Sequence, residues 1–191
     1  MKPPRAPAAA GPPPTNATLR DAALAYLARY SATQAGLLRV LDRRIRRWAR
    51  ASQGETNEAP SIEIPLTAAR ALVTRLAAAG ALDDAAFAAG RVRALRRAGR
   101  SSRAIVAHLH AKGVPAPLAA QPDEPAAELA AALLYAARRR MGPFRVEPDD
   151  ATRLKDLARL ARAGFPAATA HAVLDMSADH AEDLLLKARR G

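Results

Sequence analysis

A repeated helix-ending signal is the feature that most constrains the fold of this chain. In three places a leucine is followed four residues later by a glycine and then by an apolar residue, and the glycines are Gly80, Gly113 and Gly164. Glycine adopts the left-handed conformation without steric cost, so the residue after it can fold back onto the last helical turn. This spacing, the Schellman motif, predicts three short helices that end at these glycines.

The expected starts of the following helices are marked by residues that accept hydrogen bonds from free backbone amides. Asp83 or Asp84 begins one helix, and Ser101 or Ser102 begins the next. Both residue types are favoured at helix starts, and Asp adds a negative charge at the positive end of the helix dipole. The stretch 76–114 is therefore expected to be a compact helical unit.

Alanine dominates the apolar residues, with 51 of the 191 positions. Alanine favours helix but buries little area, so we expect several thin helical cores instead of one thick core. Aromatic residues make up 4% of the chain, which argues against a large sandwich or barrel. The fold class predicted from these observations is all-α.

Apolar residues at helical spacing predict about nine helices and a tail segment. Thr18 is expected to cap the first helix, and the polar segment 52–60 is expected to be a loop. The expected ranges are 18–30, 34–51, 65–79, 84–98, 102–113, 115–121, 125–141, 150–163, a helix from 166, and a last piece at 178–190.

An apolar residue followed by proline recurs at Pro65, Pro115 and Pro166, with spacings of 50 and 51. This regularity favours a tandem array of three-helix repeats, although such helix starts can also recur by chance in a proline-rich chain. The predicted division is a disordered Pro/Ala-rich tail at 1–17, three repeats at 18–80, 81–122 and 123–176, and a tail or helix at 177–191.

The positive charge is concentrated in the first two thirds of the chain. The formal net charge is +12, and residues 121–191 contribute none of it because their eleven cations match eleven acids. A clustered basic surface suits a polyanion or an acidic protein groove. Arginine supplies 26 of the 30 cations, which a codon bias on solvated faces would also give, but the clustering favours a functional surface.

On the fourth predicted helix, Arg93, Arg96, Arg97 and Arg100 are spaced to share one face. Arginine suits phosphate and carboxylate because its planar guanidinium donates paired hydrogen bonds. The candidate filament- or DNA-binding face comprises Arg43, Arg47, Arg50, Arg91, Arg93, Arg96, Arg97, Arg100, Arg103 and Lys112.

No pattern indicates an enzyme, a cofactor or a metal site. The chain contains no cysteine, no glycine-rich phosphate loop and no G-x-S-x-G element. His108 and His110 are two residues apart on a predicted helix, so they cannot share a metal ion. No apolar run approaches the roughly 20 residues of a membrane helix, and no secretory signal is apparent, which favours a cytoplasmic protein.

The chain resembles the RecX regulatory proteins over residues 18–174. The resemblance rests on A-L-A-Y-L-A-R-Y-S at 23–31, on G-A-L-D-D-A-A-F-A at 80–88, and on G-R-S-S-R-A-I at 99–105. It continues with L-H-A-K-G-V at 109–114 and R-A-G-F at 162–165. The motif residues within these segments are Gly80, Leu82, Asp83, Asp84, Phe87, Gly113 and Gly164.

The resemblance implies three tandem three-helix repeats in an elongated, bent molecule. It also implies binding in the groove of the RecA–DNA filament and modulation, mostly inhibition, of RecA's ATPase, strand-exchange and co-protease activities. We therefore expect a monomeric RecA regulator in DNA repair, homologous recombination and the SOS response, with weak, sequence-independent contacts to DNA. Two alternatives are an autonomous non-specific DNA-binding or nucleoid protein and a helical scaffold for another protein.

Overall fold

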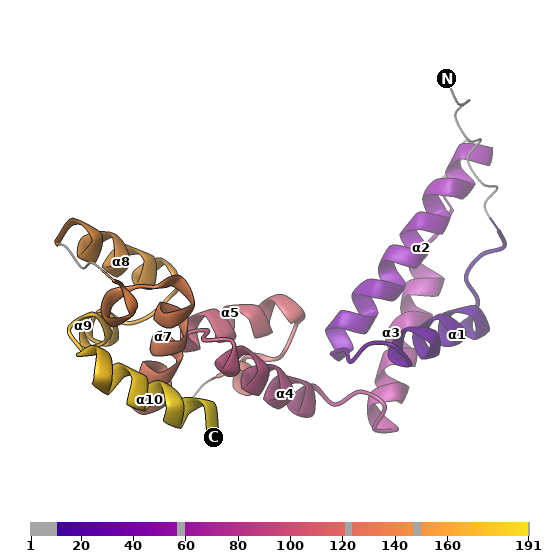
Figure 1. Ribbon diagram of the computed structural model, residues 1–191. Helices are drawn as coiled ribbons and strands as arrows, with labels where there is room; N and C mark the ends of the chain where they lie inside the picture. Colours follow the sequence, from indigo (N-terminus) through magenta and orange to yellow (C-terminus); the bar gives the residue numbers. More distant parts are fainter. Residues whose placement is uncertain (1–10, 57–59, 121–123, 147–149, 191) are drawn as a thin grey trace. The chain divides into compact units, whose positions relative to one another are not determined.

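The computed structural model describes residues 11–56, 60–120, 124–146 and 150–190, and these residues fold into helices without any strand (Figure 1). The all-α prediction is confirmed for this part of the chain, whereas residues 1–10 of the predicted tail lie outside it. The helices are α1 (Asn16–Leu27), α2 (Gln34–Thr56), α3 (Glu63–Ala78), α4 (Asp84–Arg97), α5 (Ser102–Lys112), α6 (Ala116–Ala119), α7 (Pro125–Arg139), the short 3-10 helix η1 (Gly142–Phe144), α8 (Asp150–Arg162), α9 (Ala167–Leu174) and α10 (Ala178–Arg190).

The chain forms two compact units, Met1–Phe87 and Ala88–Gly191. In unit 1, the first of these, α1, α2 and α3 pack against one another. Leu19 of α1 and Leu41 and Ile45 of α2 are fully buried there. Leucine at three- and four-residue spacing thus builds a small apolar core, as the sequence pattern predicts.

In unit 2, residues 88–191, the main core lies between α7, α8, α9 and α10. Leu133, Leu160 and Val173 are fully buried in it. The C-terminal segment is a helix, and it packs on α7 with Ala181 and Leu185 in the core. Helix α10 is therefore part of the folded unit.

The three predicted glycine helix ends are confirmed. Gly80, Gly113 and Gly164 have φ angles of 72°, 82° and 91°, in the left-handed region. In each case the amide after the glycine donates to the leucine carbonyl five residues earlier, at 2.9 to 3.1 Å. These bonds satisfy carbonyl groups that a helix end leaves without partners.

The two aspartates that begin α4 serve different helices. Asp83 accepts a hydrogen bond from the amide of Ala86 at 2.8 Å, so it caps α4 itself. Asp84 is buried and accepts from the amide of Gln34 at 2.9 Å, so it caps the distant start of α2. The expected helix start is correct, and the second carboxylate also links α4 to α2 within unit 1.

Several expected helix boundaries differ from the structure by a few residues, and two of the differences have a clear physical cause. Helix α1 begins at Asn16, because Thr15 accepts from the amide of Thr18 and Thr18 bonds back to the amide of Thr15. Helix α2 continues to Thr56, through residues expected to form a loop. Polar residues and a single glycine each lower the stability of a helix by only about 1 kcal/mol or less. The next residue that is strongly unfavourable in a helix is Pro60.

Replacement of Asp84 by Ala is expected to destabilise unit 1 by about 1–3 kcal/mol, because a partly buried amide at the start of α2 loses its acceptor. Asp84→Asn retains an acceptor oxygen and is expected to have a smaller effect. Urea unfolding followed by the fluorescence of Trp48, which lies on α2, measures both variants. An Asp84→Ala protein as stable as the parent chain contradicts this role.

Candidate polyanion-binding surfaces

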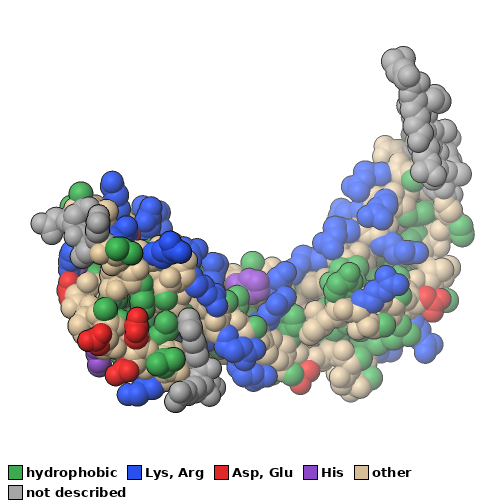
Figure 2. Space-filling view, viewed as in Figure 1, with side chains coloured by type: hydrophobic (Ala, Val, Ile, Leu, Met, Phe, Trp, Pro, Cys, Tyr) green, Lys and Arg blue, Asp and Glu red, His purple; other side chains and the backbone are tan. Residues whose placement is uncertain are grey.

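Helix α2 presents one row of arginines to solvent. Arg43, Arg47 and Arg50 are exposed and follow each other at helical spacing, opposite the buried Leu41 and Ile45. Within the described residues, none of these three guanidiniums pairs with a carboxylate. Figure 2 shows the Lys and Arg side chains in a row along α2. The predicted basic face of this helix is therefore available to an anion.

Helix α4 presents a smaller basic side than expected. Arg93 and Arg97 are exposed, lie four residues apart on one side of the helix, and form no ion pair among the described residues. Arg91 is also exposed, but it lies two residues before Arg93 and therefore on another side of the helix. The structure thus brings Arg93 and Arg97 together and places Arg91 on another side of α4.

Arg100 does not belong to the helical row, and its expected place on one face with Arg93 is wrong. Helix α4 ends at Arg97, and Gly99 has a φ of 70°. The amide of Arg100 then donates to the carbonyl of Leu95 at 3.0 Å, which is a fourth Schellman-type end. Because the chain turns at Gly99, Arg100 lies in the connection between α4 and α5.

Arg96 points into the protein. Its Nη1 atom lies 2.7 Å from Oε2 of Glu128 on α7, and the two side chains are largely buried. Its Nη2 atom donates to the hydroxyl of Ser102, which in turn donates to the same carboxylate. The amide of Ser102 also donates to Oε2 of Glu128, at 2.9 Å. Arg96 therefore binds the helix starts of α5 and α7 together instead of facing solvent.

These bonds determine the charge state of Glu128. Burial by itself raises the pKa of the Glu128 carboxyl, but hydrogen bonds from Ser102 and Arg96 outweigh burial and hold the pKa below its ordinary value of 4.5. The carboxylate is consequently ionised at neutral pH and complements the positive start of α5.

The two predicted cations of α5 lie on opposite sides of the helix, because Arg103 and Lys112 are nine residues apart. The imidazole of His108 lies on the same helix, and its pKa is lowered by burial and then by the positive charges of Arg91, Lys112 and Arg100. His108 is therefore neutral at pH 7, and this part of α5 has a positive potential.

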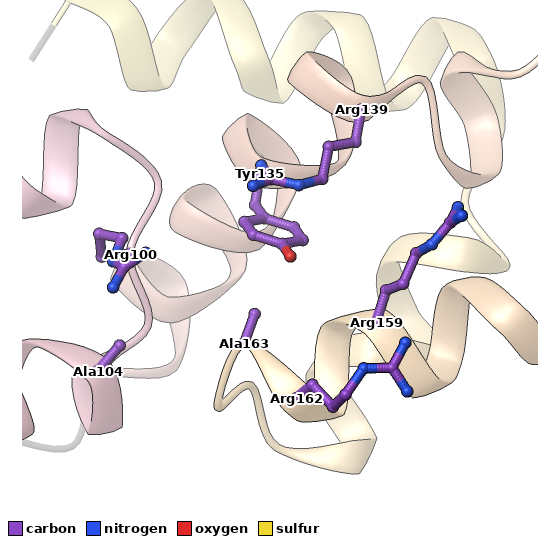
Figure 3. Close-up of a pocket in the computed structure, with 7 residues that line it drawn as sticks. All are labelled: Arg100, Ala104, Tyr135, Arg139, Arg159, Arg162 and Ala163. Atoms are coloured by element: carbon purple, nitrogen blue, oxygen red, sulfur yellow. The ribbon is translucent and has the colours of Figure 1, made fainter.

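A second cluster of arginines surrounds a pocket of about 300 Å³ in unit 2, and of its members the sequence pattern singled out Arg100 alone. Arg100 lines it together with Arg139 of α7 and Arg159 and Arg162 of α8, and Tyr135 of α7 lies between them (Figure 3). The signal that could have revealed part of this cluster is the three-residue spacing of Arg159 and Arg162 on one helix.

Comparison with known proteins identifies the family. The chain is 42% identical over 163 residues to a regulatory protein RecX of Myxococcus xanthus, an alignment that covers 82% of this chain and 84% of the relative. The chain belongs to the RecX family. A regulatory protein RecX of Agrobacterium fabrum is 38% identical over 106 residues, which is 55% of this chain and 58% of the relative.

The family model described as the second three-helix domain of RecX matches residues 83–121, within the range predicted for the second repeat. No solved structure matches the chain. Among the described helices of this RecX-family chain, none has the length and apolar character needed to cross a membrane. The division into three repeats stays a prediction.

Replacement of Glu128 by Gln is expected to lower the free energy of unfolding at pH 7 by about 2 kcal/mol, because bonds to a charged acceptor are lost. The pKa of Glu128 is lower in the folded state than its ordinary value. The stabilisation is therefore fully present above about pH 4.5 and is lost as the pH falls through the folded-state pKa. The difference between the two proteins should therefore shrink in acid, as measured by urea unfolding from neutral pH to below 4.

Asp42→Asn is the matched control, because Asp42 and Arg46 form a more exposed pair within one helix, 2.9 Å apart. Solvent screens such an exposed pair, so its contribution to stability is small. A difference between Glu128→Gln and the parent protein that stays constant with pH contradicts the role assigned to the ionised carboxylate.

Proposed function

We propose that this protein binds the RecA–DNA filament and modulates RecA, mostly by inhibiting its ATPase, strand-exchange and co-protease activities. The protein acts in the cytoplasm, as a monomer without a cofactor, in DNA repair, homologous recombination and the SOS response. Its contribution to the reaction is binding, and RecA supplies the chemistry.

The observation that supports this proposal most strongly is the set of exposed arginines without carboxylate partners in the described chain. Arg43, Arg47 and Arg50 form one such row on α2, and Arg93 and Arg97 form another on α4. Guanidiniums that make no internal ion pairs remain available to phosphates or to acidic side chains of a partner. Because the chain belongs to a family of regulatory proteins, we infer that the partner of these two basic rows is a regulated protein.

Autonomous, sequence-independent DNA binding is a second candidate, which the net charge of +12 favours. Neutralising phosphates releases counterions, so binding to duplex DNA weakens with salt by a log–log slope of about 0.9 for each phosphate contacted. Equal affinity for naked and RecA-coated DNA would favour this candidate over filament recognition.

The triple variant Arg93→Glu, Arg97→Glu and Arg103→Glu is expected to require at least about tenfold more protein to inhibit the RecA ATPase on single-stranded DNA. Each reversal replaces attraction to a polyanion by repulsion, and tenfold corresponds to about 1.4 kcal/mol of binding free energy. Arg96 is left in place because it supports the fold, and Arg100 because it lines the separate pocket.

The matched control reverses Arg20, Arg70 and Arg75, three exposed residues outside the predicted face, and changes the net charge by the same amount. This control is expected to inhibit RecA nearly as well as the parent protein. Equal loss of inhibition in the two triple variants would indicate that total charge, and not this surface, determines binding.

A further inference from the structure

The pocket of unit 2 draws its cations from three separate places in the chain. Arg100 comes from the connection between α4 and α5, Arg139 from the end of α7, and Arg159 and Arg162 from the second half of α8. In Figure 3 these side chains surround Tyr135, whose hydroxyl points into the space between them. Four positive groups and one O–H donor therefore line a single concavity, and no carboxylate of the described residues lines it.

Internal ion pairs neutralise little of this charge. Arg159 lies 3.1 Å from Asp156, but Asp156 is fully buried and also pairs with Arg145 at 2.8 Å. One carboxylate is thus shared by two guanidiniums. Among the described residues, Arg100, Arg139 and Arg162 have no carboxylate within ion-pair distance. Like charges that line one pocket repel one another, and an anion bound between them would offset this repulsion.

The backbone around the pocket is closely packed, which fixes the backbone positions from which Arg100 and Arg162 extend. A Cβ atom on Gly99 would lie only 3.0 Å from the amide nitrogen of Tyr135, so the turn that presents Arg100 packs directly on α7. The hydroxyl of Ser101 donates to the carbonyl of Ala163 at 2.7 Å and ties α5 to the end of α8.

One of the guanidiniums is itself held in place. The Arg139 guanidinium carbon lies 3.9 Å from the centre of the Tyr135 ring, a cation–π contact that restricts the side chain. An anion that enters the pocket therefore meets a partly ordered set of donors, which reduces the entropy lost on binding.

We propose that Arg100, Arg139, Arg159 and Arg162 form a binding site for adjacent phosphate groups. The planar guanidinium donates paired hydrogen bonds to phosphate oxygens, and the phenol of Tyr135 adds a further donor. Four cations exceed the single charge of one phosphodiester, so the site suits two or more linked phosphates. A nucleic-acid backbone and the polyphosphate of a free nucleotide share this chemistry. The site does not depend on the proposed regulation of RecA.

Isothermal titration of the full chain with inorganic tripolyphosphate tests the site without RecA. The double variant Arg139→Gln and Arg162→Gln is expected to bind tripolyphosphate at least about tenfold more weakly than the parent protein. Arg139→Lys with Arg162→Lys retains the charge but loses the paired donors, so its affinity should lie between the two. Circular dichroism verifies that each variant has the helical content of the parent.

The matched control is Arg70→Gln with Arg75→Gln, which removes the same charge from α3 and should leave tripolyphosphate binding unchanged. Absence of binding by the parent protein, or an equal loss in the two Gln double variants, overturns the proposal.

A competition experiment then distinguishes a nucleic-acid backbone from a free nucleotide as the ligand of the site. Displacement of tripolyphosphate by a single-stranded oligonucleotide assigns the site to a nucleic-acid backbone, and displacement by ATP but not by the oligonucleotide assigns it to a free nucleotide.

Discussion

The helix arrangement depends on carboxylates that reach from the first turn of one helix to the first amide of an earlier helix. Asp84 of α4 accepts from the amide of Gln34, and Glu128 of α7 accepts from the amide of Ser102. In both places a hydroxyl residue directly before that amide also caps the helix. A buried negative charge is stable at these points because the helix start supplies free donors and a positive dipole. The second helices of the first and second predicted repeats are therefore held in the same way.

The same interactions determine which arginines can meet a ligand. Arg96 completes the hydrogen-bonding of Glu128, so its charge is used within the fold. The turn at Gly99 directs Arg100 away from the helical row and into the pocket with Arg139 and Arg162. The basic residues of this RecX-family chain thus divide into structural, surface and pocket sets, and adjacent residues in the sequence belong to different sets.

Local sequence signals are sufficient where the physical cause is local. A leucine four residues before a glycine, with an apolar residue after the glycine, is enough to identify the helix ends at Gly80, Gly113 and Gly164. Gly99 has the same spacing from Leu95, but a charged residue follows it, so the apolar contact that marks the motif is missing. The role of Arg96 could not be predicted, because its partner lies 32 residues away on another helix. The pocket could not be predicted either. Residues 121–191 have no net charge, and this balance conceals the local excess of arginines around the pocket.

The packing of α10 has a practical consequence for work with this protein. Ala181 and Leu185 cover one side of the unit 2 core, where α10 packs on α7. A chain truncated at the end of the third predicted repeat would expose that side of the core to solvent. Loss of the buried leucine alone would lower the free energy of unfolding by about 1.5–3 kcal/mol. The freshly uncovered apolar area would favour self-association. Recombinant versions of the protein should therefore extend through this helix, with any purification tag attached beyond it by a flexible spacer.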